Sequence, residues 1–79
     1  MALRSNIDQQ EREFLEQLAN NFGMPAVLDE LRAICEVWAH RAAEDDNERA
    51  DTFYTLTAAS LKPLVAHLRA EIAKMNPQQ

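Results

Sequence analysis

Glycine and proline are almost absent from this sequence. Its 79 residues include one glycine and three prolines, and these two residue types supply most of the sharp turns that short strands and loops need. A chain with so few of them can make only two or three short connections. We therefore predict an all-α fold, a three-helix assembly with one short, one medium and one long helix. Residues 1–79 should form a single helical domain, with residues 76–79 as a disordered tail.

The first helix is expected at about residues 6–22. Ser5 and Asp8 resemble a capping pair, and an apolar stripe at helical spacing follows them. The stripe consists of Ile7, Phe14, Leu15, Leu18 and Phe22. Gly23, the only glycine, should end this helix in a left-handed conformation, and Pro25 suits the first turn of the next helix.

The second helix, predicted at about residues 25–43, is apolar over an unusually wide arc. At roughly 100° per residue its apolar positions cover roughly 200°, about twice what one partner helix needs. These positions are Leu28, Leu31, Ile34, Cys35, Trp38 and Ala42, with Val27, Val37 and Ala39 at the margins. We expect this helix to be central, packed either on two neighbours of the same chain or on one neighbour and a second subunit.

The third helix is predicted at about residues 47–75, after a turn at residues 45–47. Asp45 and Glu48 could form its capping pair. Its apolar stripe keeps one phase through Pro63, which favours one long helix kinked at that proline over two helices separated there. The stripe comprises Ala50, Tyr54, Thr57, Leu61, Leu64, Leu68, Ile72 and Met75.

The charge pattern argues against polyanionic partners. A net charge of −5 disfavours DNA and anionic membranes, although the basic residues of segment 60–79 could attract the acidic segment 1–59 within the fold or between subunits. Glu11 interrupts the first apolar stripe, so it should either overhang the core or meet a basic residue such as Arg69 or Lys74. We find no membrane span and no signal core, and we expect a cytoplasmic protein without nucleic-acid or membrane partners.

Residues 18–24, Leu-Ala-Asn-Asn-Phe-Gly-Met, resemble the first helix and turn of a helix-turn-helix motif. This resemblance implies a DNA-binding regulator. The next helix departs from the motif, because Asp29 and Arg32 stand where apolar residues belong. An ordinary helical hairpin with a glycine cap explains these residues equally well, so DNA binding is carried as an alternative.

Two carboxylate pairs suggest a second alternative. The segments Glu13-Phe14-Leu15-Glu16 and Glu48-Arg49-Ala50-Asp51 resemble the E-x-x-E and E-x-x-D motifs of all-helical nucleotide pyrophosphohydrolases of the MazG type. The resemblance implies that Glu13, Glu16, Glu48 and Asp51 hold magnesium beside a triphosphate. Here a whole helix separates the two halves, and solvated helix faces produce such pairs in an acidic chain. Whether the four carboxylates converge on a metal is left open.

Other side chains that can bind metals are better explained without one. His40 lies one helical turn from Glu36 and from Glu44, on the polar side of its helix, where exposed ion pairs are expected. Cys35 is the only cysteine, which excludes an intramolecular disulfide, and we expect it to be buried as a small hydrophobe. No cofactor and no metal are predicted.

These patterns predict a noncatalytic protein, a small acidic interaction or regulatory module. It would act as a homodimer or through a groove that takes a partner helix, because its apolar stripes are wider than one short chain can cover. A protein partner is also open, and the acidic segment from Glu44 to Asp51 could engage a basic one. The interface candidates are Val27, Ile34, Val37, Trp38, Leu56, Leu64, Leu68 and Ile72.

Overall fold

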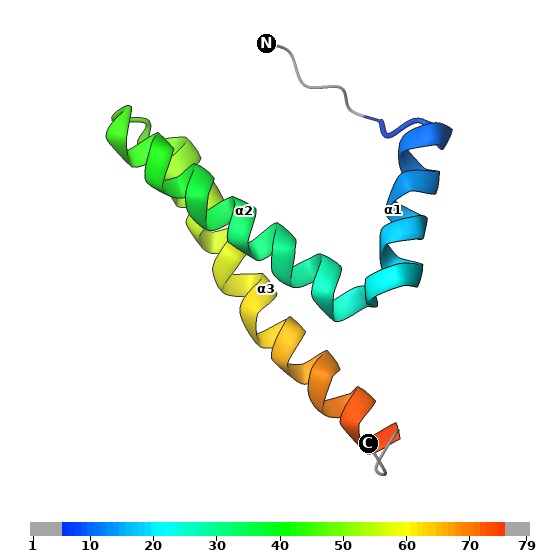
Figure 1. Cartoon of the computed structure of the whole chain (residues 1–79). Coiled ribbons are helices and arrows are strands. Elements are labelled where there is room, and N and C mark those ends of the chain that lie inside the picture. The colour runs from blue at the N-terminus through cyan, green and yellow to red at the C-terminus, as the bar shows by residue number, and fades with distance from the viewer. Residues whose placement is uncertain (1–5, 76–79) are drawn as a thin grey trace.

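The computed structural model describes residues 6–75, and this part of the chain is all-α, as predicted. It contains helices α1 (Gln9–Phe22), α2 (Met24–Glu44) and α3 (Glu48–Met75), and no strand occurs within residues 6–75. Figure 1 shows α2 and α3 side by side as an antiparallel hairpin, while α1 turns away at the start of α2. The result is a V with α1 as one arm and the hairpin as the other. The predicted tail at 76–79 lies outside the described residues.

A capping box begins α1 later than the predicted start at residue 6. The Oδ1 atom of Asp8 accepts a hydrogen bond from the N–H of Glu11 at 2.8 Å, and Oε1 of Glu11 accepts one from the N–H of Asp8 at 3.0 Å. Asp8 is therefore the N-cap, and Ser5, the predicted first member of the pair, lies outside the described residues. The reciprocal bonds explain why Glu11 interrupts the apolar stripe, since a carboxylate is needed there to close the box.

Gly23 is the only residue between α1 and α2. Its N–H donates to the carbonyl of Ala19 at 2.8 Å, and its backbone has φ 86° and ψ 156°. The positive φ agrees with the predicted glycine boundary. The extended ψ differs from the predicted left-handed helical conformation, in which ψ is about 47°. Pro25 is buried in the first turn of α2, which begins at Met24, one residue earlier than predicted.

The turn at residues 45–47 separates α2 from α3. Asp46 has a left-handed φ of 56°, and Oδ1 of Asn47 accepts a hydrogen bond from the N–H of Ala50 at 3.2 Å. Asn47 thus caps α3, and the predicted capping pair of Asp45 and Glu48 is wrong. The helix then runs without interruption through an exposed Pro63, which confirms one long helix instead of two.

The core of the hairpin is made of small side chains. The buried apolar residues are Ala39, Ala42, Ala58 and Val65. Val65, at 3% exposure, is more buried than any residue of the predicted α3 stripe, whereas Leu64 of that stripe is 43% exposed. The most buried positions of α3 thus lie beside the predicted stripe, of which Tyr54, Leu61 and Leu68 are half-buried. Cys35 is half-buried and not buried as expected.

The chain is too open to complete a core by itself. Its radius of gyration is 15.4 Å, against about 11.6 Å for a compact domain of this length. Its shortest dimension is 15 Å, which accommodates two packed helices at an axial distance of about 8–10 Å and no third layer. Within residues 6–75, no large side chain is fully buried.

Candidate functional site

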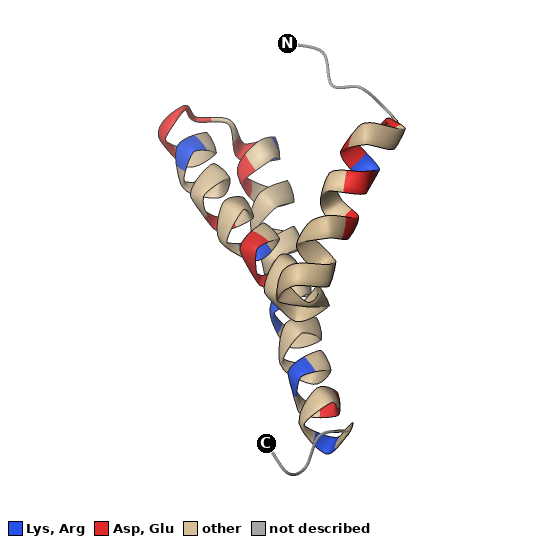
Figure 2. Cartoon of the chain, turned by 45° about the vertical axis from the view of Figure 1, so that its right-hand side comes forward, with Lys and Arg blue, Asp and Glu red and all other residues tan. Residues whose placement is uncertain are grey.

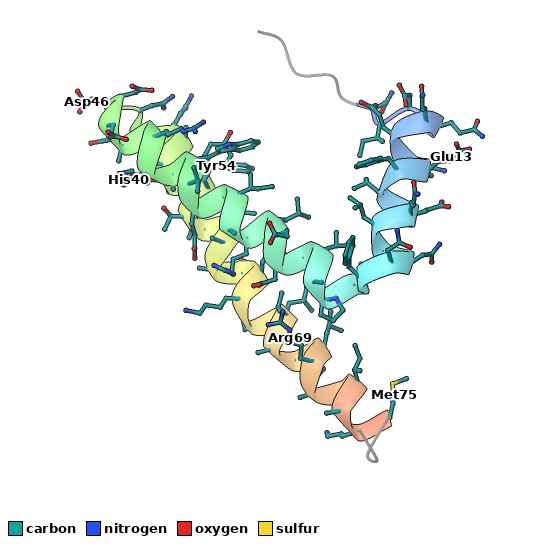
Figure 3. The ribbon with its side chains drawn as sticks, viewed as in Figure 1. Glu13, His40, Asp46, Tyr54, Arg69 and Met75 are labelled. Atoms are coloured by element: carbon teal, nitrogen blue, oxygen red, sulfur yellow. The ribbon has the colours of Figure 1, made fainter. Side chains whose placement is uncertain are left out.

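An apolar groove of about 650 Å³ lies between α1 and α2. Side chains from both helices project into the space between the arms of the V (Figure 3). The lining residues are Leu15, Leu18 and Phe22 of α1, Ala26, Val27, Asp29, Glu30, Leu31 and Ile34 of α2, and Arg69 of α3. The groove is thus a mainly hydrophobic trough with charged groups among its lining, a form suited to the apolar face of a helix.

The wide apolar arc of α2 serves two different surfaces. Ala39 and Ala42 are buried in the hairpin, whereas Leu31 and Ile34 line the groove and remain 43% and 39% exposed. The arc was predicted to meet two neighbours of the same chain, or one neighbour and a second subunit. One side of α2 is covered by α3, and the short contact with α1 leaves the other side largely open.

Aromatic side chains account for much of the uncovered apolar surface. Phe14, Phe22, Trp38 and Phe53 are 62%, 67%, 46% and 63% exposed. At roughly 150–250 Å² per aromatic side chain, these four rings leave on the order of 400 Å² in contact with water. This area is divided among several surfaces, because Phe22 lines the groove while Trp38 and Phe53 contact Tyr54 on the hairpin.

Three of the aromatic rings form a cluster near the closed end of the hairpin. The ring of Trp38 meets that of Tyr54 edge-on, with centroids 5.4 Å apart and an interplanar angle of 69°. Phe53 meets Tyr54 in the same way, at 5.4 Å and 71°. The cluster therefore joins α2 to α3, and Figure 3 shows Tyr54 on the side of the hairpin that faces α1.

A charged network lies at the groove. Asp29 accepts a hydrogen bond from Nε of Arg32 at 2.8 Å, and its other oxygen lies 3.8 Å from Nη2 of Arg69. The bond from Arg32, reinforced by the charges of both arginines, holds the pKa of the Asp29 carboxyl below its usual value. Arg32 also contacts Glu36 at 2.7 Å. The pair of Asp29 and Arg69 links α2 to α3, so the attraction expected between acidic and basic segments occurs within the chain at this point.

The predicted interface residues are spread over several surfaces. Val27 and Ile34 line the groove, and Trp38 belongs to the aromatic cluster. Val37 lies in a shallow hollow on another face of α2, with His40 and Arg41. On α3, Leu68 is half-buried, and the exposed candidates are Leu56, Leu64 and Ile72.

Sequence reasoning missed the contribution of α1 to the groove. Leu15, Leu18 and Phe22 form one of its walls, yet the interface was predicted on the second and third helices alone. The signal was present in the sequence, because an amphipathic helix needs a partner for its apolar stripe. None of the residues of α1 is buried, so the apolar stripe of α1 lacks a packing partner within its own chain.

The carboxylates of the pyrophosphohydrolase resemblance are not brought together. Glu13 and Glu16 lie on α1, whereas Glu48 and Asp51 lie in the first turn of α3, and Figure 2 shows these acidic segments on different arms of the V. Across residues 6–75, no group of three or more histidine, cysteine or acidic side chains is placed to hold a metal ion.

The structure also bears on the predictions for His40 and for the helix-turn-helix resemblance. The His40 side chain is 80% exposed, with Nε2 3.7 Å from Oε1 of Glu44, which agrees with an exposed pair. A single residue, Gly23, joins α1 to α2, whereas the helix-turn-helix motif has a turn of about three or four residues. Asp29 and Arg32, which depart from that motif, bond to each other at the groove.

Comparison of the chain with protein-family models, with curated proteins and with solved structures found no match. Among the helices described, none is sufficiently long and apolar to cross a bilayer. The groove and its uncovered apolar walls are therefore the features from which a function can be argued.

Proposed function

We propose that this chain is a noncatalytic interaction module that works as a homo-oligomer, and that its copies associate through the groove between α1 and α2. The observation that supports this most directly is the uncovered state of the groove walls. Leu31 and Ile34 are about two-fifths exposed, and Phe22 is two-thirds exposed. Large apolar side chains arranged on one concave surface mark a protein–protein contact when they are this poorly covered.

The groove can form the apolar centre of a protein interface. A standard protein interface buries about 800 Å² on each partner. Phe22, at 67% exposure, supplies on the order of 100 Å² of this, and the aliphatic side chains of the groove add to it. Such an interface has the apolar centre and charged rim that stable complexes show, with Arg69 and Glu30 among the charged groups here.

Sedimentation equilibrium of the full chain tests this function. We expect a mass of at least twice the 9.0 kDa of one chain at micromolar concentrations. Ile34→Glu places an unpaired charge on the groove wall and should raise the dissociation constant by at least about tenfold, the equivalent of 1.4 kcal/mol.

Val37→Glu is the matched control for this substitution. Val37 is also β-branched and lies on the same helix, but outside the groove, so the variant should associate as the wild type does. Circular dichroism must show that both variants remain helical. A wild-type protein that stays monomeric over the micromolar range, or equal weakening by both substitutions, would overturn the proposed role of the groove.

A further inference from the structure

We infer that the groove is filled by α1 of a second copy of this chain, exchanged reciprocally in a two-fold dimer. This inference rests on the proposed function and adds the identity of the segment that occupies the groove. Its basis is the position of α1, which contacts the beginning of α2 and is not packed against α3. Figure 1 shows this arm turned away from the hairpin, and the groove lies between it and α2.

α1 carries the apolar surface that the groove needs. Its stripe includes Phe14 and Phe22, which are 62% and 67% exposed, and the helix has no buried residue. A second copy therefore brings an amphipathic helix whose apolar side chains are uncovered in the single chain. Self-complementary association of two copies covers the groove and the α1 stripe in the same step.

The lengths of the two surfaces agree. The 14 residues of α1 span about 21 Å at 1.5 Å per residue, and its stripe from Phe14 to Phe22 spans about 12 Å. On α2 the open stripe from Val27 to Trp38 spans about 16 Å. The α1 stripe of a partner can thus lie along α2 without leaving either end of its own apolar surface in water.

Two-fold symmetry closes the arrangement. If α1 of one copy enters the V of the other, the reverse must also hold, so the two α1 helices become neighbours between the two α2 helices. Four apolar stripes then converge on one core, as in a four-helix bundle. Both grooves are filled in the same step, and no further copy can add.

The basic group that lines the groove lies on α3. α1 carries exposed carboxylates at Glu13 and Glu16, while the second half of α3 carries Arg69 and Lys74, whose side chains are 57% and 74% exposed. Figure 2 shows the acidic segments of α1 and the basic positions of α3 on separate parts of the molecule. Arg69 lines the groove together with Asp29 and Glu30, and it already lies 3.8 Å from Asp29, so a partner's α1 would meet an opposite charge there only at Arg69.

Disulfide mapping with mixed chains tests the exchange. Cys35→Ser first removes the native thiol, and Leu15→Cys and Ile34→Cys are then made in separate proteins. Leu15 and Ile34 lie on the α1 and α2 sides of the groove, so a bond between chains needs α1 of one copy against α2 of the other. We expect the mixed disulfide to form nearly to completion after the two proteins are mixed and oxidised.

The matched control is Leu15→Cys mixed with Ala59→Cys. Ala59 is exposed on α3, in a hollow with Thr55 and Lys62 that shares no residue with the groove, so only background cross-linking is expected. Isotope-filtered nuclear Overhauser spectra of mixed labelled and unlabelled wild-type chains give a second readout without substitutions. Contacts between chains should join the methyl groups of Leu15 and Leu18 to those of Leu31 and Ile34.

The outcomes separate the two proposals. A dimer that shows the disulfide and the interchain methyl contacts supports the exchange. A dimer that lacks those methyl contacts, or that cross-links no better than the control pair, overturns the exchange and leaves the self-associating module standing. A wild-type chain that remains monomeric overturns both.

Discussion

Gly23 is the residue on which the direction of α1 depends. Its φ of 86° with ψ of 156° falls in a region that is nearly restricted to glycine. A Cβ atom at this position would meet Cδ of Pro25 at 3.8 Å, an ordinary contact, so the cost of Gly23→Ala comes from the backbone and not from crowding. We expect the free energy of unfolding to fall by about 1–3 kcal/mol, measured by urea denaturation at fixed protein concentration.

Asn21→Ala is the control for this substitution. Asn21 is exposed in the last turn of α1, where alanine is a better helix former than asparagine, so no loss of stability is expected. Equal effects of the two substitutions would show that the backbone at Gly23 carries no special constraint.

Asp29 gives the protein a predictable response to acid. Hydrogen bonding from Arg32, with the charges of Arg32 and Arg69, keeps the pKa of the folded carboxyl below 3.8. The stabilisation is therefore complete above the unfolded pKa of about 3.9 and is lost as the pH falls through the lower folded value. The difference in unfolding free energy between wild type and Asp29→Asn should shrink between pH 7 and pH 3.

The Arg32→Gln substitution tests whether Arg32 causes the pH-dependent stabilisation by Asp29. Arg32 is the main cause of the lowered pKa of Asp29, so the Asp29→Asn substitution should change stability less, and with less dependence on pH, in the Arg32→Gln background. An effect of Asp29→Asn that is the same at both pH values would contradict the assignment.

At the scale of whole helices, substitution of Pro63 tests whether α3 is one continuous helix. A proline inside a helix lacks the N–H donor, and its ring crowds the carbonyl four residues earlier. Pro63 is exposed within an unbroken helix that runs from Glu48 to Met75, so Pro63→Ala should raise the free energy of unfolding, by about 1–3 kcal/mol. Thermal unfolding followed by circular dichroism measures the change. If Pro63 stood in the first turn of a separate helix, the substitution would bring little or no gain.

The helices and their connections were largely predictable, while the contact face of α3 was not. Gly23 and the change of phase at residues 45–47 marked both boundaries, because each is a local property of the chain. The predicted α3 stripe included Leu64, which is 43% exposed, and left out Val65, which the hairpin buries. Neighbouring positions on a helix differ by about 100°, and the face that turns inward depends on the partner helix. Periodicity alone could not choose between the two residues.

The position of α1 relative to the hairpin could not be predicted from the sequence, because it also depends on how the helices pack against each other. The wide apolar arc of α2 indicated two contacts, but it could not show that α3 would take one and that α1 would stand away from the other. That geometry is set by one backbone conformation at Gly23 and by the absence of a third layer over the hairpin. The groove walls on α1 were missed because the interface was predicted on the second and third helices alone.

The open shape leads to a prediction about the stability of the whole molecule. No large side chain of residues 6–75 is fully buried in the single chain, so in the proposed dimer part of the core forms between copies and folding is linked to association. Each tenfold increase in protein concentration should stabilise a dimer by about 1.4 kcal/mol, which raises the midpoint of thermal unfolding by roughly 3–6 °C. Calorimetry over a wide concentration range measures this. The Ile34→Glu variant should unfold at a lower temperature than the wild type at each concentration, whereas a wild-type midpoint that does not move would mean that one chain folds alone.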